Sequence, residues 1–227
     1  MMLRKEPTYW DVLILSLFTA LITWHPYFMH GKINIFEIGL YLPGIQSVLN
    51  GEIPYRDVFH LRGPLELYVP ALLMKLFGVH IGVLYSYFYA GSVLCLIFCA
   101  LIAKEVLKSR FMLYLFVPVL IGRTFPRVVF TYWGGMRYVL GLTTVLCLIK
   151  FVRTQRLNWG FAAGLLSGLS LMTSVEIGVC TLFATVCVYA LAYFFYQSMD
   201  HKFLGKAALS FLGGLGLVLG VFGIYMV

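Results

Sequence analysis

The sequence predicts an all-α polytopic membrane protein with about seven transmembrane helices. Two observations lead to this fold class. First, 61% of the 227 residues are hydrophobic and only 11% are charged, whereas soluble domains are about half apolar and about a quarter charged. Second, the apolar residues form long blocks, as expected where each helix must satisfy its own backbone hydrogen bonds in lipid. We expect a single transmembrane domain over residues 1–227.

The first apolar block, residues 12–29, is expected to be an uncleaved transmembrane helix. Arg4 and Lys5 precede it, as in a signal peptide, but His25 and Pro26 stand where a small-residue cleavage site would be needed. The further blocks that we expect to lie in the membrane are residues 79–103, 111–122, 128–149, 159–173, 177–196 and 207–227.

Glycines recur at a spacing of four residues in two of these blocks. Gly160, Gly164 and Gly168 lie in one block, and Gly216 and Gly220 lie in another. This spacing allows helices to approach each other closely in lipid. We therefore interpret both sets as packing positions rather than as a phosphate-binding loop.

The distribution of basic residues predicts a cytoplasmic N-terminus. In this orientation ten Lys and Arg residues fall on the inner face and six on the outer face, leaving Lys75 aside, which agrees with the positive-inside rule. The net charge of +8 is thus explained by membrane orientation, and no nucleic-acid partner is expected. Five of the six outer cations are Arg, whose planar fork suits phosphate or carboxylate.

The outer loop, residues 30–78, concentrates the titratable groups of the chain. Glu37, Glu52, Asp57 and Glu66 lie in it, four of the nine acidic residues. Because the rest of the chain is mostly apolar, polar chemistry at a membrane surface is most expected in this loop. We therefore take it as the candidate active region.

Two short interfacial helices are expected in this outer loop. Residues 43–50 begin at a proline, carry an apolar stripe and end at Gly51, a typical helix C-cap. Residues 65–77 follow Pro64 and end at Gly78. The second helix is too short to span a bilayer. The segment between the two helices is predicted to form turns.

Four candidate site residues follow from this arrangement. Glu37 is expected just before the first interfacial helix. Asp57, His60 and Arg62 lie between the two helices, and all four could face a shared cavity at the outer membrane surface. Simpler interpretations remain open: Glu37 could be an ordinary loop acid, His60 a turn residue, and Asp57 the partner of Arg56.

Two further charged residues allow alternative interpretations. Glu66 follows Pro64 by two residues and is best explained as a favourable charge in the first turn of a helix. Arg137 lies inside the apolar block 128–149, where an ionisable residue is costly and by default functional. The alternative for Arg137 is a side chain that snorkels to the outer surface.

Three features of the outer loop occur together: Glu37 near its start, residues 51–57 reading GEIPYRD, and Gly63-Pro64 opening a helix. The combination resembles the first loop of GT-C fold membrane glycosyltransferases, which include protein O-mannosyltransferases and bacterial lipid-linked sugar transferases. Residues 160–178 are similar to a small-residue helix of that family, which often ends in Thr-Lys-Pro. Here Thr173-Ser174-Val175 replaces the Lys-containing form, which puts any role of that Lys in doubt.

The resemblance implies a membrane enzyme, expected in the bacterial inner membrane, with its active loop on the extracytoplasmic side. It implies transfer of a sugar from a polyprenyl-phosphate carrier to an acceptor, with membrane lipid as its surroundings. Glu37 is the candidate base for the acceptor hydroxyl. Asp57 is the second catalytic candidate. With His60, Asp57 could orient the acceptor or help to hold a divalent metal, whose requirement the sequence leaves unknown.

Cations are needed to stabilise the leaving phosphate. Arg123, Arg127 and Arg137 are candidates by residue type and by depth, and Arg62 is a further substrate-binding candidate in the outer loop. Family members are usually longer and carry a C-terminal soluble domain. We therefore expect the chain to correspond to the N-terminal part of such a protein.

Two other classes of function remain open at this stage. A transporter or flippase would suit charges at membrane depth and interrupted helices, although the sequence contains no recognisable inverted repeat. A non-catalytic membrane subunit is the other alternative. Substitution of Glu37 would discriminate between the classes, because a scaffold should tolerate the change.

Overall fold

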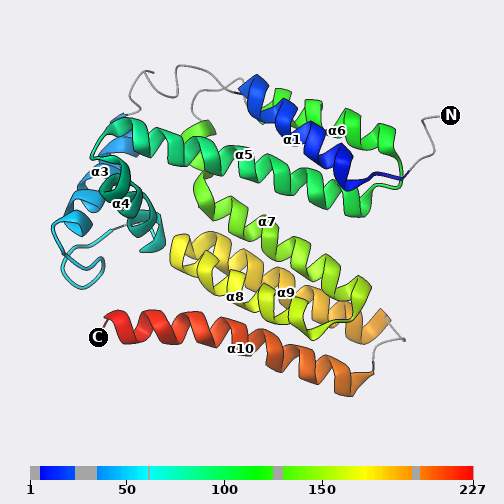
Figure 1. Cartoon of the computed structure of the whole chain (residues 1–227). Coiled ribbons are helices and arrows are strands. Elements are labelled where there is room, and N and C mark those ends of the chain that lie inside the picture. The colour runs from blue at the N-terminus through cyan, green and yellow to red at the C-terminus, as the bar shows by residue number, and fades with distance from the viewer. Residues whose placement is uncertain (1–5, 24–34, 61, 125–129, 196–199, 227) are drawn as a thin grey trace. The chain divides into compact units, whose positions relative to one another are not determined.

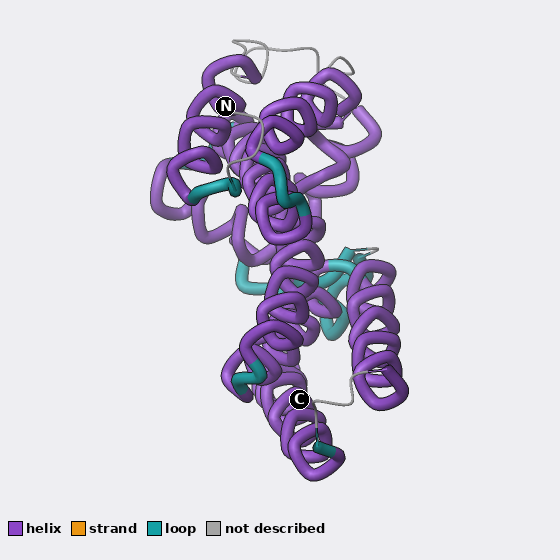
Figure 2. The backbone as a smooth tube through the Cα atoms, turned by 90° about the vertical axis from the view of Figure 1, so that its right-hand side faces the viewer, coloured by secondary structure: helices purple, strands orange, loops and turns teal. Residues whose placement is uncertain are grey.

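The computed structural model describes residues 6–23, 35–60, 62–124, 130–195 and 200–226. Within these residues the named elements are all α-helices (Figures 1 and 2). The helices are α1 (Tyr9–Thr23), α3 (Ile35–Leu49), α4 (Leu65–Phe77), α5 (Ile81–Val106), α6 (Arg110–Thr124), α7 (Phe130–Thr154), α8 (Leu157–Thr173), α9 (Val175–Phe195) and α10 (His201–Met226).

Three of these helices are long and apolar enough to cross a membrane. They are α5 with 26 residues, α9 with 21 residues, and the first 25 residues of α10. At 1.5 Å per residue, each covers about the 30 Å of a bilayer's hydrocarbon core. The prediction of an all-α membrane protein is confirmed at this level. The count of about seven spans stays a prediction, because α1 and α6 have 15 residues each and α8 has 17.

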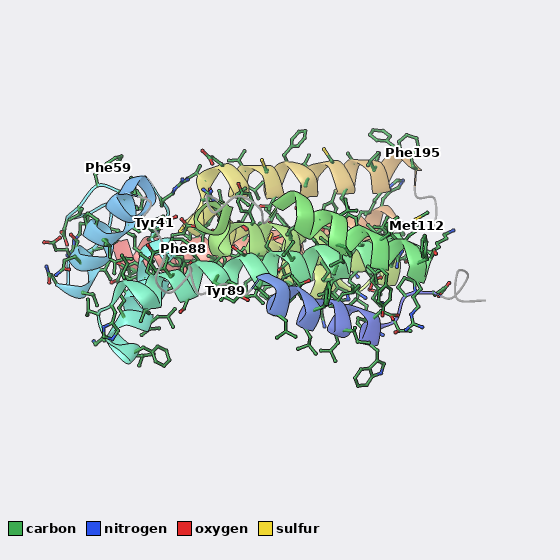
Figure 3. The ribbon with its side chains drawn as sticks, turned by 90° about the horizontal axis from the view of Figure 1, so that it is seen from above. Tyr41, Phe59, Phe88, Tyr89, Met112 and Phe195 are labelled. Atoms are coloured by element: carbon green, nitrogen blue, oxygen red, sulfur yellow. The ribbon has the colours of Figure 1, made fainter. Side chains whose placement is uncertain are left out.

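The chain folds as two compact units, residues 1–46 with 69–139 and residues 47–68 with 140–227. In the first unit, α1, α5 and α6 pack against one another through a common apolar cluster. The buried members of this cluster are Val12, Leu15, Leu96, Ala100, Ala103, Leu113 and Val117. On the same unit, Tyr41 of α3 meets Phe88 of α5 edge to face, with ring centroids 5.0 Å apart (Figure 3).

A buried ion pair joins α1 to α6 in the first unit. Asp11 is fully buried, and its Oδ1 accepts hydrogen bonds from Arg110 Nε at 2.6 Å and from Tyr114 Oη at 2.9 Å. Its Oδ2 accepts from the backbone N–H and the hydroxyl of Thr8, both at 2.8 Å. A buried carboxylate is tolerated when its oxygens are paired in this way.

The second unit is built on a close contact between α8 and α10. A Cβ atom at Gly164 would overlap the backbone carbonyl of Phe211, and one at Gly168 would lie 2.8 Å from Val218 Cβ. The packing role predicted for the first glycine set is therefore confirmed. The second set behaves differently, because a Cβ at Gly216 or Gly220 would meet nothing within 4 Å.

Helices α8 and α9 form a tight hairpin with Ser174 as the connecting residue. A Cβ atom at Gly178 would lie 2.6 Å from Leu171 Cα, so the two helices approach closely at the turn. Glu176 lies in the first turn of α9, where a negative charge is favourable, and its side chain is exposed. We refer to residues 173–175 as the α8–α9 corner.

The helices of the outer loop match the prediction at three of four ends. Helix α4 has the predicted bounds, and Gly78 follows it with a φ of 97°. Helix α3 ends at Leu49, and Gly51 follows as the predicted cap with a φ of 90°. The N–H groups of Gly51 and Glu52 bond the carbonyls of Val48 and Ser47, both at 3.0 Å, which is the Schellman arrangement.

The start of α3 corrects the position expected for Glu37. The described helix already includes Ile35, ahead of Pro43, so Glu37 lies within α3 and not in a loop before it. Proline removes the hydrogen bond from its own nitrogen to the carbonyl four residues earlier, but the apolar residues ahead of it can still be helical. Pro43 is thus an interior residue of α3 and not its first one.

Candidate functional site

The candidate site is formed by residues 47–68 together with the α8–α9 corner, which belong to the same compact unit. The backbone N–H of Gly63 donates a hydrogen bond to the carbonyl oxygen of Thr173 at 3.0 Å. The last carbonyls of a helix lack partners within the helix, so the loop satisfies one of those of α8. This bond joins the two segments on which the family resemblance rests.

Glycine is required at position 63 because the loop lies directly on the end of α8. A Cβ atom there would overlap the carbonyl oxygen of Met172 and lie 2.7 Å from the carbonyl carbon of Thr173. Pro64 is buried beside it and opens α4, since proline is favoured in the first turn of a helix. The Gly63-Pro64 element thus fixes both the docking of the loop and the start of α4.

The GEIPYRD segment folds into a turn that is organised by Asp57. Its Oδ2 accepts from the backbone N–H of Ile53 at 2.8 Å. The Arg56 side chain donates to both carboxylate oxygens, with Nε 3.0 Å from Oδ1 and NH2 3.1 Å from Oδ2. The backbone closes the same turn, as Tyr55 N–H donates to the carbonyl of Val58 at 2.8 Å. The pairing of Asp57 with its neighbours is therefore observed.

These contacts shift the pKa values of Asp57 and Arg56. The hydrogen bond from Arg56, followed by that from Ile53 N–H, lowers the pKa of Asp57 below its ordinary value of 3.8. In the same way the hydrogen bond to Asp57 raises the pKa of Arg56. A carboxylate with a lowered pKa is a weaker base. The geometry favours a role for Asp57 in positioning Arg56 rather than in accepting a proton.

His60 and Tyr55 hold the next turn, because one bonds the backbone N–H of Arg62 and the other bonds its carbonyl oxygen. The N–H of Arg62 donates to His60 Nδ1 at 3.0 Å, and the phenol of Tyr55 donates to the carbonyl oxygen of Arg62. Because a backbone N–H can only donate, Nδ1 acts as acceptor and the neutral ring carries its proton on Nε2. His60 is buried, and its observed contacts agree with the turn-residue interpretation.

Tyr55 has an unusual backbone conformation at this site. Its φ is 70°, in the left-handed region that non-glycine residues rarely adopt. Burial, followed by the charge of Glu66, raises the pKa of its phenol. Strain of this kind persists where surrounding contacts hold the residue, and here the phenol is fixed to Arg62.

Glu66 is a residue whose position in the site was missed from the sequence. It lies in the first turn of α4, as predicted, and it is only 1% exposed, which the first-turn position alone does not predict. The signal was present in the helical spacing: Leu67, Ala71 and Met74 are also buried and recur on one side of the helix. Glu66 is next to Leu67 on this side of the helix, so its side chain is buried as well.

The exposed rim of the site is aromatic and cationic. Tyr68 and Tyr225 pack edge to face with centroids 5.9 Å apart, and their hydroxyl groups are 3.4 Å apart. In the same unit, the side chain of Arg56 is 48% exposed. Phe59 projects from the same loop and is 79% exposed (Figure 3). An exposed guanidinium can bind an anionic group, and exposed aromatic rings favour a membrane interface.

The remaining predicted residues lie outside this loop. Glu37 is on α3 and Arg123 is on α6, and the described side chains include neither of them. Arg127 lies outside the described residues. Arg137 is on α7, in the portion that belongs to the first unit. It is 5% exposed, and its guanidinium lies 4.9 Å from the centroid of the Tyr138 ring. This burial shows that the Arg137 side chain is enclosed by protein.

The residues described by the structure contain no group of three or more His, Cys, Asp and Glu side chains close enough to hold a metal ion. Asp57 and His60, the two residues considered for a metal, are instead bonded within their own turns. No protein-family model, curated protein or solved structure matches this chain.

Proposed function

We propose that the chain is the membrane part of a glycosyltransferase that takes a sugar from a polyprenyl-phosphate donor and passes it to an extracytoplasmic acceptor. One observation carries this proposal. The two segments that resemble GT-C enzymes, Gly63-Pro64 and the α8–α9 corner, are joined by the hydrogen bond from Gly63 to Thr173. Segments with a common functional origin are expected to meet in space.

The reaction requires a carboxylate and cations. The acceptor oxygen attacks the anomeric carbon and loses its proton to the carboxylate, while the bond between that carbon and the phosphate oxygen breaks. The electron pair of that bond leaves with the polyprenyl phosphate, whose charge the cations stabilise. In this proposal Glu37 is the candidate base, and Arg123, Arg127 and Arg137 are the candidate ligands of the phosphate, by residue type and depth.

The contacts of Arg56 support its inclusion among the candidates that bind a substrate anion. Asp57 engages its Nε and one of its terminal nitrogens, and a guanidinium has five N–H donors in all. The remaining donors, on a side chain that is 48% exposed, are available to a substrate anion. Asp57 then acts as the residue that orients Arg56.

The test is a transfer assay with the purified full-length chain in lipid vesicles. Polyprenyl-phosphate-linked sugars are supplied as donors, and release of the sugar from the carrier is measured for wild type, Glu37→Gln and Glu52→Gln. Loss of general base catalysis costs about 10²- to 10⁴-fold in rate. We expect Glu37→Gln to lose turnover by that amount and to keep donor binding.

Glu52→Gln is the matched control, because Glu52 is an exposed acid of the same loop. It should retain wild-type turnover. Equal turnover in Glu37→Gln and wild type would remove Glu37 as the base. If wild type releases no sugar from any donor, the proposal fails, and a transporter or a non-catalytic subunit becomes the better explanation.

A further inference from the structure

A groove between α7 and α9 lies in the second unit and has no role in the proposed reaction. The two helices touch near Gly141, where a Cβ atom would lie 2.9 Å from Ile177 Cγ2 and 3.8 Å from Thr181 Cγ2. Farther along both helices they enclose a groove of about 280 Å³. Its lining residues are Val145, Leu148, Ile149, Val152, Arg153, Ala184 and Val188.

The groove is suited to a hydrocarbon chain. Six of its seven lining residues are apolar, and Arg153 is the charged member. Two surfaces lie side by side on α9: the groove at Ala184, and the neighbouring position Phe183, which is 69% exposed. Since α9 is long and apolar enough to cross a membrane, these surfaces face lipid rather than water. A concave apolar surface in lipid is filled by an acyl chain, because water has no polar partners there.

The charge at one end of the groove selects the head group. Arg153 lies in the last turn of α7 and is the charged residue among those that line the groove. In the same unit α10 begins with His201 and Lys202. Basic positions at the ends of membrane helices bind the phosphate groups of anionic lipids. The guanidinium also favours phosphate through paired hydrogen bonds.

We propose that this groove binds one anionic phospholipid, with an acyl chain between α7 and α9 and the head-group phosphate at Arg153. The proposal rests on two features found together. The apolar part of the groove suits the acyl chain, and Arg153 at its end suits the head-group phosphate. This binding does not depend on the transferase reaction, since Arg153 and Ala184 lie outside the candidate site.

The experiment uses the purified full-length chain in detergent with two synthetic lipids that have the same acyl chains. One is phosphatidylglycerol, which is anionic, and the other is phosphatidylcholine, which is zwitterionic. Bound lipid is counted by native mass spectrometry as each lipid is titrated. A single basic residue near a lipid surface is worth about fivefold in affinity. Wild type should therefore prefer phosphatidylglycerol by about fivefold.

Two substitutions with matched controls test the two parts of the site. Arg153→Gln should abolish the preference for phosphatidylglycerol, whereas Arg156→Gln, an exposed residue outside the groove, should retain it. Ala184→Phe should fill the groove and reduce binding of both lipids about tenfold. Val186→Phe, on the exposed side of the same helix, should bind like wild type.

Three results would overturn the proposal. They are equal binding of the two lipids by wild type, equal losses in Arg153→Gln and Arg156→Gln, and unchanged binding in Ala184→Phe. The second result would indicate a diffuse basic surface. If Ala184→Phe does not fold, Val145→Phe fills the groove from α7 and makes the same test.

Discussion

The backbone N–H of Gly63 donates to the carbonyl oxygen of Thr173, with the two atoms 3.0 Å apart. The bond ties the outer loop to the last carbonyls of α8, which would otherwise lack partners. It also places the Gly63-Pro64 element against the α8–α9 corner. The backbone of the loop makes this contact, and the side chains of Asp57, Tyr55 and His60 hold the turns ahead of it.

The first prediction concerns this contact. Gly63→Ala should destabilise the second unit by about 1–3 kcal/mol, the usual cost of overpacking, because the new Cβ would overlap the carbonyl oxygen of Met172. Thermal unfolding in detergent measures this loss. Limited proteolysis should also cut the loop between Ser47 and Tyr68 faster than in wild type.

Gly82→Ala is the control for this change, because a Cβ at Gly82 would meet nothing within 4 Å. It lies in α5 and should be neutral or stabilising by up to about 1 kcal/mol. If Gly63→Ala unfolds at the wild-type temperature and resists protease equally, the docking of the loop on α8 is not what holds it.

The second prediction compares glycines on the two helices that pack most closely. Gly164→Ala should lower the free energy of unfolding by about 1–3 kcal/mol, since its Cβ would overlap the carbonyl of Phe211. Gly216→Ala on α10 has open space around it and should gain up to about 1 kcal/mol. Unfolding of both variants in the same detergent is the measurement. Equal effects would contradict the observed α8–α10 interface.

The third prediction concerns the buried carboxylate of the first unit. Asp11→Asn should cost about 1.5–3 kcal/mol, the range for hydrogen bonds to a charged group, because Asp11 is fully buried against Arg110 and Tyr114. Unfolding in detergent gives the loss. Glu52→Gln, at an exposed acid, should change stability by less than about 0.5 kcal/mol.

A double-mutant cycle separates this ion pair from other effects of the substitutions. Arg110→Gln should cost less in the Asp11→Asn background than in wild type, because the partner charge is already gone. Additive losses would show that the two side chains stabilise the fold independently. In that case the ion pair seen between α1 and α6 would contribute little.

The sequence predicted the helix ends of the outer loop well, and the reason is local. Gly51 and Gly78 adopt positive φ, a conformation that glycine reaches at little cost. Pro64 directly precedes α4, and proline is favoured at the start of a helix. Local signals were insufficient at Pro43. A proline can start a helix or lie inside one, and only the packing of the preceding turn decides between them.

The positions that depend on a partner helix could not be assigned from spacing alone. Glycines four residues apart occur on both α8 and α10, yet on α10 it is Gly214 that lies against Phe161 of α8. The burial of Glu66 depends likewise on which face of α4 turns inward. The contact of Gly63 with Thr173 joins segments far apart in sequence, and no local pattern encodes it.

The last prediction concerns Asp57, whose carboxylate bonds Ile53 N–H and the Arg56 guanidinium. Its pKa is lowered below 3.8, mainly by Arg56, so the folded state favours the ionised form. The stabilising contribution is therefore fully present above about pH 3.8 and is lost as the pH falls through the lower folded-state pKa. Hydrogen exchange at the Ile53 amide should be slow at neutral pH and should accelerate, relative to distant amides, only in strong acid.

Asp57→Asn tests whether this residue positions Arg56 or accepts a proton. Asn can still accept the bond from Ile53 but loses the ion pair, so exchange of the Ile53 amide should lose its acid dependence. If Glu37 is the base, sugar release by Asp57→Asn should fall by less than about tenfold, well short of the 10²- to 10⁴-fold loss of a general base. A loss of that larger size, with donor binding unchanged, would transfer the base role from Glu37 to Asp57.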